Sequence, residues 1–407
     1  MLCDEPIRTQ DPRTRHTSGR DGAGVKQGAD LRTGIRSPAR LAIGAAFVVH
    51  GAISGSWATT IPWVKEDLRL GAGALGLALL GHALGAVLVM PLAGAVIAQR
   101  GSRVVTRAML VLDAGALALT VVAPALWALF PMLMFFGGAG GAMDVAMNAQ
   151  GVALERLAGR PILSSFHALW SVGGFAGALL GAGAARIGLS PTLHIPLICV
   201  ALITGGLLAT RRLLPGDLDR SQEGPRFVWP RGTLALLGVV AFCAMLAEGA
   251  ALDWSGVYLR VGLGADATIA AIAVASFSLG MAIGRFVGDA LVLRFGPVAF
   301  VRAAGIVALS GLAIAVLGGV PSLGVVGFAL LGLGLSSIVP VVLSRAGRIS
   351  GIGAPGIAAV TWMGYTAFVV GPSLVGGVAE FTELRIALAV VLGLIACIPL
   401  LAARVEG

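Results

Sequence analysis

The chain has 407 residues, of which 57% are hydrophobic and 12% are charged, and its formal net charge is +9 at pH 7. This is about half the charged fraction of a soluble domain, so the composition excludes an ordinary soluble protein and indicates a membrane-embedded one. The basic residues lie at the edges of apolar segments, without zinc-ligand clusters or aromatic-basic motifs, so we expect no nucleic-acid partner.

Residues 1–40 contain no apolar run and therefore lack the hydrophobic region of a signal peptide. We expect them to form a disordered tail. After this tail, the sequence contains twelve apolar runs of roughly 20 residues or more, the length needed to cross about 30 Å of hydrocarbon as a helix. The runs cover residues 41–64, 72–98, 104–123, 126–154, 162–185, 188–209, 233–258, 267–293, 299–319, 321–343, 353–378 and 384–403.

The longest polar connection between runs, at residues 211–231, divides them six and six. We therefore predict an all-α integral membrane protein with two six-helix bundles, at 41–210 and 232–403, joined by this linker and followed by a short tail at 404–407. Most of the 29 Lys and Arg residues fall on the side of the membrane that holds both termini. The positive-inside rule makes that side cytoplasmic, in a multi-pass protein of the cytoplasmic membrane, and we expect a monomer in the lipid bilayer.

The two halves show an internal repeat. Residues 84–108 align with residues 279–303 without a gap at an offset of 195, which pairs Gly85 with Gly280 and Gly101 with Gly296. Two parallel repeats related by an axis along the membrane normal would enclose a cavity between them. Rocking of one bundle over the other would expose this cavity to each side in turn.

With these features the chain resembles the major facilitator superfamily over residues 41–403. That family carries a pattern close to GxxxDRxGRR after its second span, and here Gly94, Gly101 and Arg103 fit, although Ala98 stands at the Asp position. The second copy, from Gly284 to Gly296, is fuller. The resemblance implies a cytoplasmic gate formed by Gly101, Arg103, Arg285, Asp289 and Arg294.

More specifically, the stretches MDVAMNAQG and GRPILSSFH resemble the fourth and fifth spans of the fucose-permease-like branch, which places an acid four residues before an Asn. The resemblance implies that Asp144 takes up a coupling proton, with Asn148 and His167 nearby, and that the substrate is sugar-like. The sugar symporters of that branch also have a carboxylate late in the first span. This chain has Trp57, Ala58 and Thr59 there, which speaks against both implications.

The position of Asp144 within its span also indicates a functional role, independently of the family resemblance. Asp144 shares one helical stripe with Gly141 and Asn148, and a carboxylate near the middle of a span is costly unless it is paired, hydrated or protonated. It is therefore a candidate for proton or substrate binding, and the alternative is a structural Asp–Asn network that ties helices together. Glu248, near the middle of the seventh span, has the same two interpretations.

Three histidines within the spans are candidates for proton relay, because an imidazole changes charge near neutral pH. They are His50, His82 and His167, and each can instead be a hydrogen-bonded core residue. Trp170, Trp362 and Tyr365 are candidates for stacking on a substrate ring.

We predict a secondary active transporter that moves a small solute by alternating access, coupled to protons. The alternatives are proton-driven efflux of an amphipathic compound and a sensor that has the transporter fold without transport. An enzyme is not expected, since the short loops hold no nucleophile–base set or nucleotide motif. The scattered cysteines and the absence of ligand clusters likewise predict no metal site and no cofactor.

Overall fold

The structure is a computed structural model that describes residues 37–158, 162–216, 229–348 and 354–405. Regular structure in these ranges is helical throughout. The expected disordered tail falls almost entirely outside the described residues, as do the middle of the predicted linker, at 217–228, and the last two residues.

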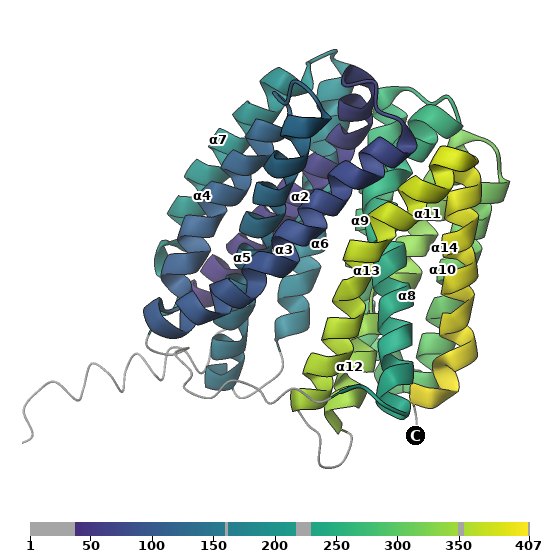
Figure 1. The fold of residues 1–407 in the computed structure, drawn as a ribbon. Helices are drawn as coiled ribbons and strands as arrows, with labels where there is room; N and C mark the ends of the chain where they lie inside the picture. The colour runs from purple at the N-terminus through teal and green to yellow at the C-terminus, as the bar shows by residue number, and fades with distance from the viewer. Residues whose placement is uncertain (1–36, 159–161, 217–228, 349–353, 406–407) are drawn as a thin grey trace, which may run out of the picture.

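In the described residues the helices make twelve spans, six in each half as predicted, when the two consecutive helices between residues 321 and 348 are counted as one span. Figure 1 shows the two halves side by side. The N-terminal half consists of α2 (Pro38–Asp67), α3 (Ala72–Arg100), α4 (Ser102–Thr120), α5 (Leu126–Ala158), α6 (Leu163–Arg186) and α7 (Pro191–Ala209). The C-terminal half consists of α8 (Thr233–Val257), α9 (Ala267–Phe295), α10 (Pro297–Leu317), α11 (Pro321–Leu335), α12 (Ile338–Arg348), α13 (Ala354–Phe381) and α14 (Leu384–Leu401). We call the end where α2 begins and α14 ends the terminal end, and the opposite end the far end.

Two spans depart from a simple apolar helix. Eleven helical stretches of the described chain are long and apolar enough to cross a membrane, and α4 differs from them because its 19 residues include Arg103, Arg107 and Asp113. The predicted tenth span is two helices, α11 and α12, separated at Ser336 and Ser337. Hydroxyl groups bond backbone carbonyls at this break, since Ser336 Oγ donates to Leu333 and Ser337 Oγ donates to Gly284.

Glycines allow α3 and α5 to pack backbone against backbone. A methyl group at Gly85 would overlap the carbonyl of Met134, and one at Gly137 would overlap the carbonyl of His82. Small residues at helix interfaces permit this close approach, which replaces the hydrophobic driving force that is missing in lipid. We call these four residues the first glycine seam.

The C-terminal half has a second glycine seam in the same register. A methyl group at Gly280 on α9 would overlap the carbonyl of Ala329 on α11, and one at Gly332 would overlap the carbonyl of Phe277. Every residue of this seam lies 195 positions after its counterpart in the first. The offset found in the sequence is therefore a repeat in three dimensions.

The loops of the two halves repeat as well. Gly101, between α3 and α4, and Gly296, between α9 and α10, have φ values of 81° and 79°. At the far end, Arg69 and Gly264 have φ values of 51° and 68°. Both pairs are 195 residues apart, and Arg69 adopts a left-handed conformation that glycine adopts without steric cost in its repeat partner.

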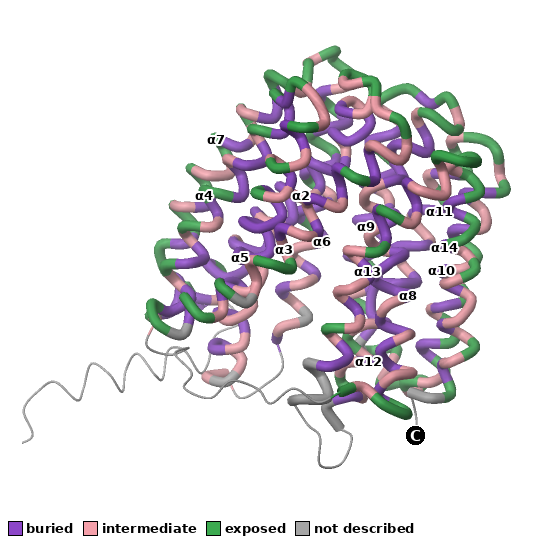
Figure 2. Tube along the Cα trace, in the orientation of Figure 1, coloured by how far each residue is buried: buried purple, intermediate pink, exposed green. Residues whose placement is uncertain are grey.

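The two halves meet along α3 and α13 and along α6 and α9. Gly76 on α3 lies against Gly376 on α13, and Gly174 on α6 lies against Ser278 on α9. The ribbons of the halves converge toward the far end and diverge toward the terminal end (Figure 1). Buried positions concentrate within each half and along these contacts, while exposed positions concentrate on the outer surfaces and at the loops (Figure 2).

Candidate functional site

Asp144 and Asn148 are one turn apart on α5 and bond each other. Asn148 Nδ2 donates to Oδ1 of Asp144 at 3.0 Å, and its Oδ1 lies 3.1 Å from Nε2 of His167 on α6. The three side chains are half-buried. Two predicted site residues on α5 are thus connected to a third on α6, at the side of the N-terminal half that faces its partner half.

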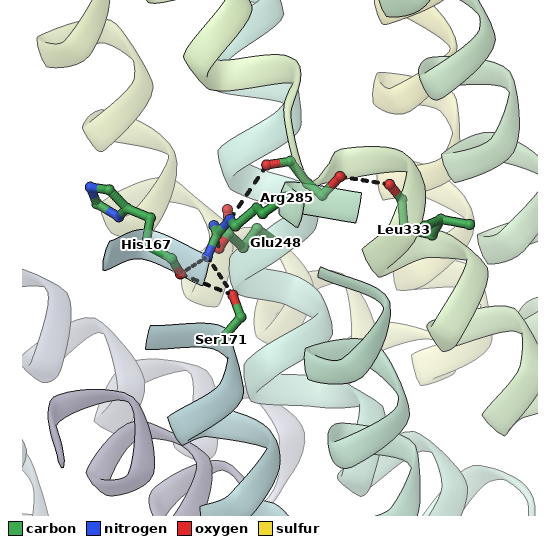
Figure 3. A network of polar contacts seen from close by, with 6 residues as sticks. His167, Ser171, Glu248, Arg285 and Leu333 are labelled. Atoms are coloured by element: carbon green, nitrogen blue, oxygen red, sulfur yellow. Dashed lines mark hydrogen bonds and ion pairs between the residues drawn. The ribbon is translucent and has the colours of Figure 1, made fainter. Parts of the chain in front are cut away.

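Arg285 on α9, in the C-terminal half, bonds to α6 of the N-terminal half beside His167 (Figure 3). Its guanidinium donates to the backbone oxygen of His167 at 3.1 Å and to the hydroxyl of Ser171, both on α6. It also pairs with Glu248 on α8, with 3.4 Å between Nη2 and Oε1, and its Nε donates to the carbonyl of Ser336, between α11 and α12.

Arg285 lies further along the span than the loop motif that predicts its place in the cytoplasmic gate, and its role in a gate stays a prediction. Eleven residues separate it from Gly296, which is about 16 Å along a helix at 1.5 Å per residue. Its side chain is 13% exposed, and that of Glu248 is 16% exposed. A guanidinium at this depth requires a carboxylate and carbonyl groups around it, so Arg285 and the predicted Glu248 belong to the central site.

Tyr365 on α13 closes the group from the C-terminal side. Its hydroxyl donates to Oδ2 of Asp144 at 3.3 Å, and its ring packs edge-on against Phe368. We define the central network as Asp144, Asn148, His167, Ser171, Glu248, Arg285 and Tyr365. It draws on both halves, and each half contributes at least one ionisable side chain near the middle of a span.

The aromatic candidates separate into two groups. Trp170 on α6 lies beneath Arg285, with the guanidinium carbon 5.8 Å from the ring centroid, so it belongs beside the central network. Trp362 on α13 is 50% exposed and its ring lies 6.0 Å from that of Trp229, near the end of the linker. Trp362 lies three residues before Tyr365 on α13, toward the terminal end.

The remaining histidines lie inside the N-terminal half. Nδ1 of His50 on α2 is 2.8 Å from Oδ2 of Asp113 on α4, and the His50 ring is 6.5 Å from that of Trp170. His82 on α3 packs edge-on against Phe136, with 5.0 Å between the ring centroids. Neither histidine contacts Asp144 directly in the described hydrogen bonds.

The other residues of the expected gate lie at the terminal end of the spans. Gly101 forms the turn between α3 and α4, and a methyl group there would overlap Gly216. Arg103 donates to the carbonyl of Arg211 at 2.7 Å, a contact within the N-terminal half, and Arg294 lies over the ring of Phe295. Asp289 is on α9, and its side chain lies outside the described part of the structure. Their role as a gate remains a prediction.

Sequence reasoning missed two contacts that join the halves at the far end. Arg260, after α8, pairs with Glu66 at the end of α2, with 2.6 Å between Nε and Oε1. Glu380 on α13 accepts a hydrogen bond of 2.6 Å from the backbone nitrogen of Gly73, in the first turn of α3. Opposite charges at the loop ends of the two halves are the signal from which the first contact could have been proposed.

Comparisons with known proteins bear on what this arrangement does. No family model matches the chain. An uncharacterised MFS-type transporter of Yersinia pestis is 35% identical over 346 residues, which cover 84% of this chain and 89% of the relative. An uncharacterised transporter of Sinorhizobium fredii is 34% identical over 348 residues, covering 84% of this chain and 92% of the relative. The chain belongs to the major facilitator superfamily.

Solved structures of this superfamily share the fold. The nucleoside transporter NupG matches with a TM-score of 0.68 at 15% identity, over 90% of this chain and 98% of NupG. The fucose:proton symporter FucP of E. coli matches with a TM-score of 0.58 over the same shares of each chain. The predicted superfamily and the two six-helix halves are confirmed. Since the relatives are transporters, the prediction that the chain is not an enzyme is confirmed as well.

Proposed function

We propose that this transporter moves a small hydroxylated solute together with protons across the cytoplasmic membrane, with both termini in the cytoplasm. The observation that carries the proposal is the central network. Carboxylates near the middle of two spans, one in each half, connect to polar groups of the opposite half through Tyr365 and Arg285. An ionisable group at this depth is costly and generally serves a substrate or ion pathway.

The chemistry of the network favours a hydroxylated solute. Carboxylate, carboxamide, guanidinium and phenol groups offer both donors and acceptors, which suits the hydroxyl groups of a sugar-like ring. Trp170 adds an aromatic face beside them. The names of two structural neighbours, a nucleoside transporter and a fucose:proton symporter, are consistent with such a solute.

Asp144 is the proposed proton carrier, because it accepts hydrogen bonds from both halves. Asn148 bonds one of its oxygens and Tyr365 of the opposite half bonds the other. Protonation of the carboxylate would weaken the hydrogen bonds that it accepts. Protonation of Asp144 would therefore weaken the contact between the two halves at Tyr365. A symporter requires such a link between proton binding and the movement of the halves.

The full chain reconstituted in proteoliposomes tests the proposal. Sugars, polyols and nucleosides are offered under an imposed pH gradient and, separately, in counterflow without a gradient. We expect uptake driven by the pH gradient in the wild type, loss of that uptake in Asp144→Asn, and counterflow retained in the variant. Asp67→Asn, at the exposed end of α2, is the control. Unchanged uptake under the pH gradient in Asp144→Asn would refute the proton role of Asp144. Export of amphipathic compounds without uptake would favour the efflux alternative.

A further inference from the structure

A His–Asp pair lies inside the N-terminal half and takes no part in the central network. Nδ1 of His50 on α2 and Oδ2 of Asp113 on α4 are 2.8 Å apart, and the two side chains are 12% and 1% exposed. The second carboxylate oxygen of Asp113, Oδ1, is buried without a hydrogen-bond partner. The pair joins two helices whose other facing residues are largely apolar.

When His50 is neutral and Asp113 is ionised, the pair has a net charge of −1 in a largely apolar interior, where an isolated charge is disfavoured, so these surroundings favour uptake of a proton by the pair. Asp113 occupies Nδ1 of the imidazole, so Nε2 is the ring nitrogen that can exchange a proton with water. Because the imidazole is more exposed than the carboxylate, His50 provides the route between Asp113 and the solvent.

The pair lies one helical turn from Asp144. Gly140 on α5 contacts both partners: a methyl group there would lie 3.2 Å from Oδ1 of Asp113 and 3.5 Å from the His50 ring. Asp144 is four residues further on, on the same face of α5. On α6, Trp170 separates His50 from Arg285, since its ring contacts both.

Titratable groups face the pair from several helices in the described chain. Asp144 on α5 and His82 on α3 lie within electrostatic range of His50, and Cys199 on α7 lies within range of Asp113. Of these, Asp144 is the group that also contacts the C-terminal half. A charge on the pair therefore acts on a residue that helps to hold the two halves together.

We infer that His50 and Asp113 form a second proton-binding site, distinct from Asp144. A proton taken from water onto Nε2 of His50 makes an imidazolium beside the Asp113 carboxylate, and its release to water restores the neutral ring. The added charge lies about one helical turn from Asp144, the residue that accepts the hydrogen bond from Tyr365. Its part in transport rests on the proposed function, but its existence as a proton site does not.

Trp170 provides a readout that needs no substrate. An imidazolium beside an indole quenches its fluorescence, and the His50 ring lies 6.5 Å from the Trp170 ring. The purified full-length protein in lipid nanodiscs is titrated from about pH 8 to pH 5, the interval in which an imidazole ordinarily changes charge. We expect the emission of the wild type to fall with pH, and this fall to be lost in both His50→Gln and Trp170→Phe.

Asp113→Asn removes the anion that favours the imidazolium, so we expect it to lose most of the change. His194→Gln, a buried histidine near the far end of α7, is the matched control and should titrate like the wild type. If Asp113→Asn fails to fold, His50→Gln and Trp170→Phe still decide the question. A flat wild-type titration, or an unchanged one in His50→Gln, overturns the inference.

The outcomes separate this inference from the proposed function. If the fluorescence titration depends on His50 but no solute is taken up under a pH gradient, the proton site stands and the proposed function fails. If uptake follows the pH gradient but His50→Gln titrates like the wild type, the transport proposal stands and the second site is refuted.

Discussion

Tyr365 donates a hydrogen bond of 3.3 Å to Asp144 across 221 residues of sequence and across the boundary between the two halves. The contact lies near the middle of α5 and of α13, so it holds the halves together within the membrane rather than at either end. Any movement that separates the halves at this level must break it.

Tyr365→Phe removes this bond and keeps the aromatic ring. A hydrogen bond to a charged group contributes about 1.5 kcal/mol, which corresponds to about a tenfold shift in the balance between joined and separated halves. We expect spin labels at positions 99 and 293, at the terminal ends of α3 and α9, to report more of the separated population. Thr366→Val is the control, because that hydroxyl bonds its own helix at the Met363 carbonyl. Identical distance distributions in the two variants would show that the bond does not hold the halves.

Glu248→Gln leaves Arg285 without its carboxylate. Loss of one partner of a buried ion pair costs about 3–5 kcal/mol, and the partial exposure of both groups reduces the expected destabilisation to about 2 kcal/mol. We expect a lower midpoint of thermal unfolding in detergent. In the double variant Glu248→Gln/Arg285→Gln, part of this loss should be recovered, since no unpaired charge remains. Strictly additive effects of the two substitutions would contradict the pairing.

The predictable part of this fold is the part determined by hydropathy. The helix limits agree with the apolar runs to within a few residues at most ends, because each span must match the same hydrocarbon thickness. The hydrogen bond between Asp144 and Asn148 could also be anticipated, since residues four apart on a helix share a face.

Contacts between distant spans were harder to foresee. Arg285 was assigned to the gate because its neighbours match a loop motif, yet helix α9 extends far enough to place it in the central network. The pairing of His50 with Asp113 joins residues 63 apart on different helices, and local spacing contains no information about such a contact. Trp170 and Trp362 lie at similar positions along α6 and α13, yet Trp170 contacts Arg285 and Trp362 contacts Trp229. Span number does not predict these partners.

The ion pair between Glu66 and Arg260 should favour the state in which the far end is closed. The side chains are 44% and 35% exposed, so the pair contributes about 0.2–1 kcal/mol. We expect Glu66→Gln to increase the open population at the far end by up to about fivefold, measured between spin labels at positions 67 and 267. Raising the ionic strength should reproduce part of this effect in the wild type and none of it in the variant. A wild type that is insensitive to salt would argue against the pair as a latch.

Alanine in the glycine seams should destabilise both halves to a similar degree. Gly137→Ala and Gly332→Ala each place a methyl group against a backbone carbonyl that a rotamer change cannot move. Forcing extra volume into such a contact costs about 1–3 kcal/mol, which should appear as a lower thermal midpoint. Gly115→Ala on α4 is the control, because a methyl group there meets nothing within 4 Å. Equal stability of all three variants would show that the seams are looser than the structure indicates.

The matched seams also bear on how movement can be distributed through the molecule. Where the backbones of two helices are in contact, the helices cannot slide past each other without a clash. The pair α3 and α5 therefore moves as one rigid unit, and the pair α9 and α11 moves as another. Asp144 belongs to the first rigid unit and Arg285 belongs to the second. When one rigid unit tilts relative to the other, the two charged residues and the loops at both ends move together. Opening on one side of the bilayer and closing on the other would then be a single movement.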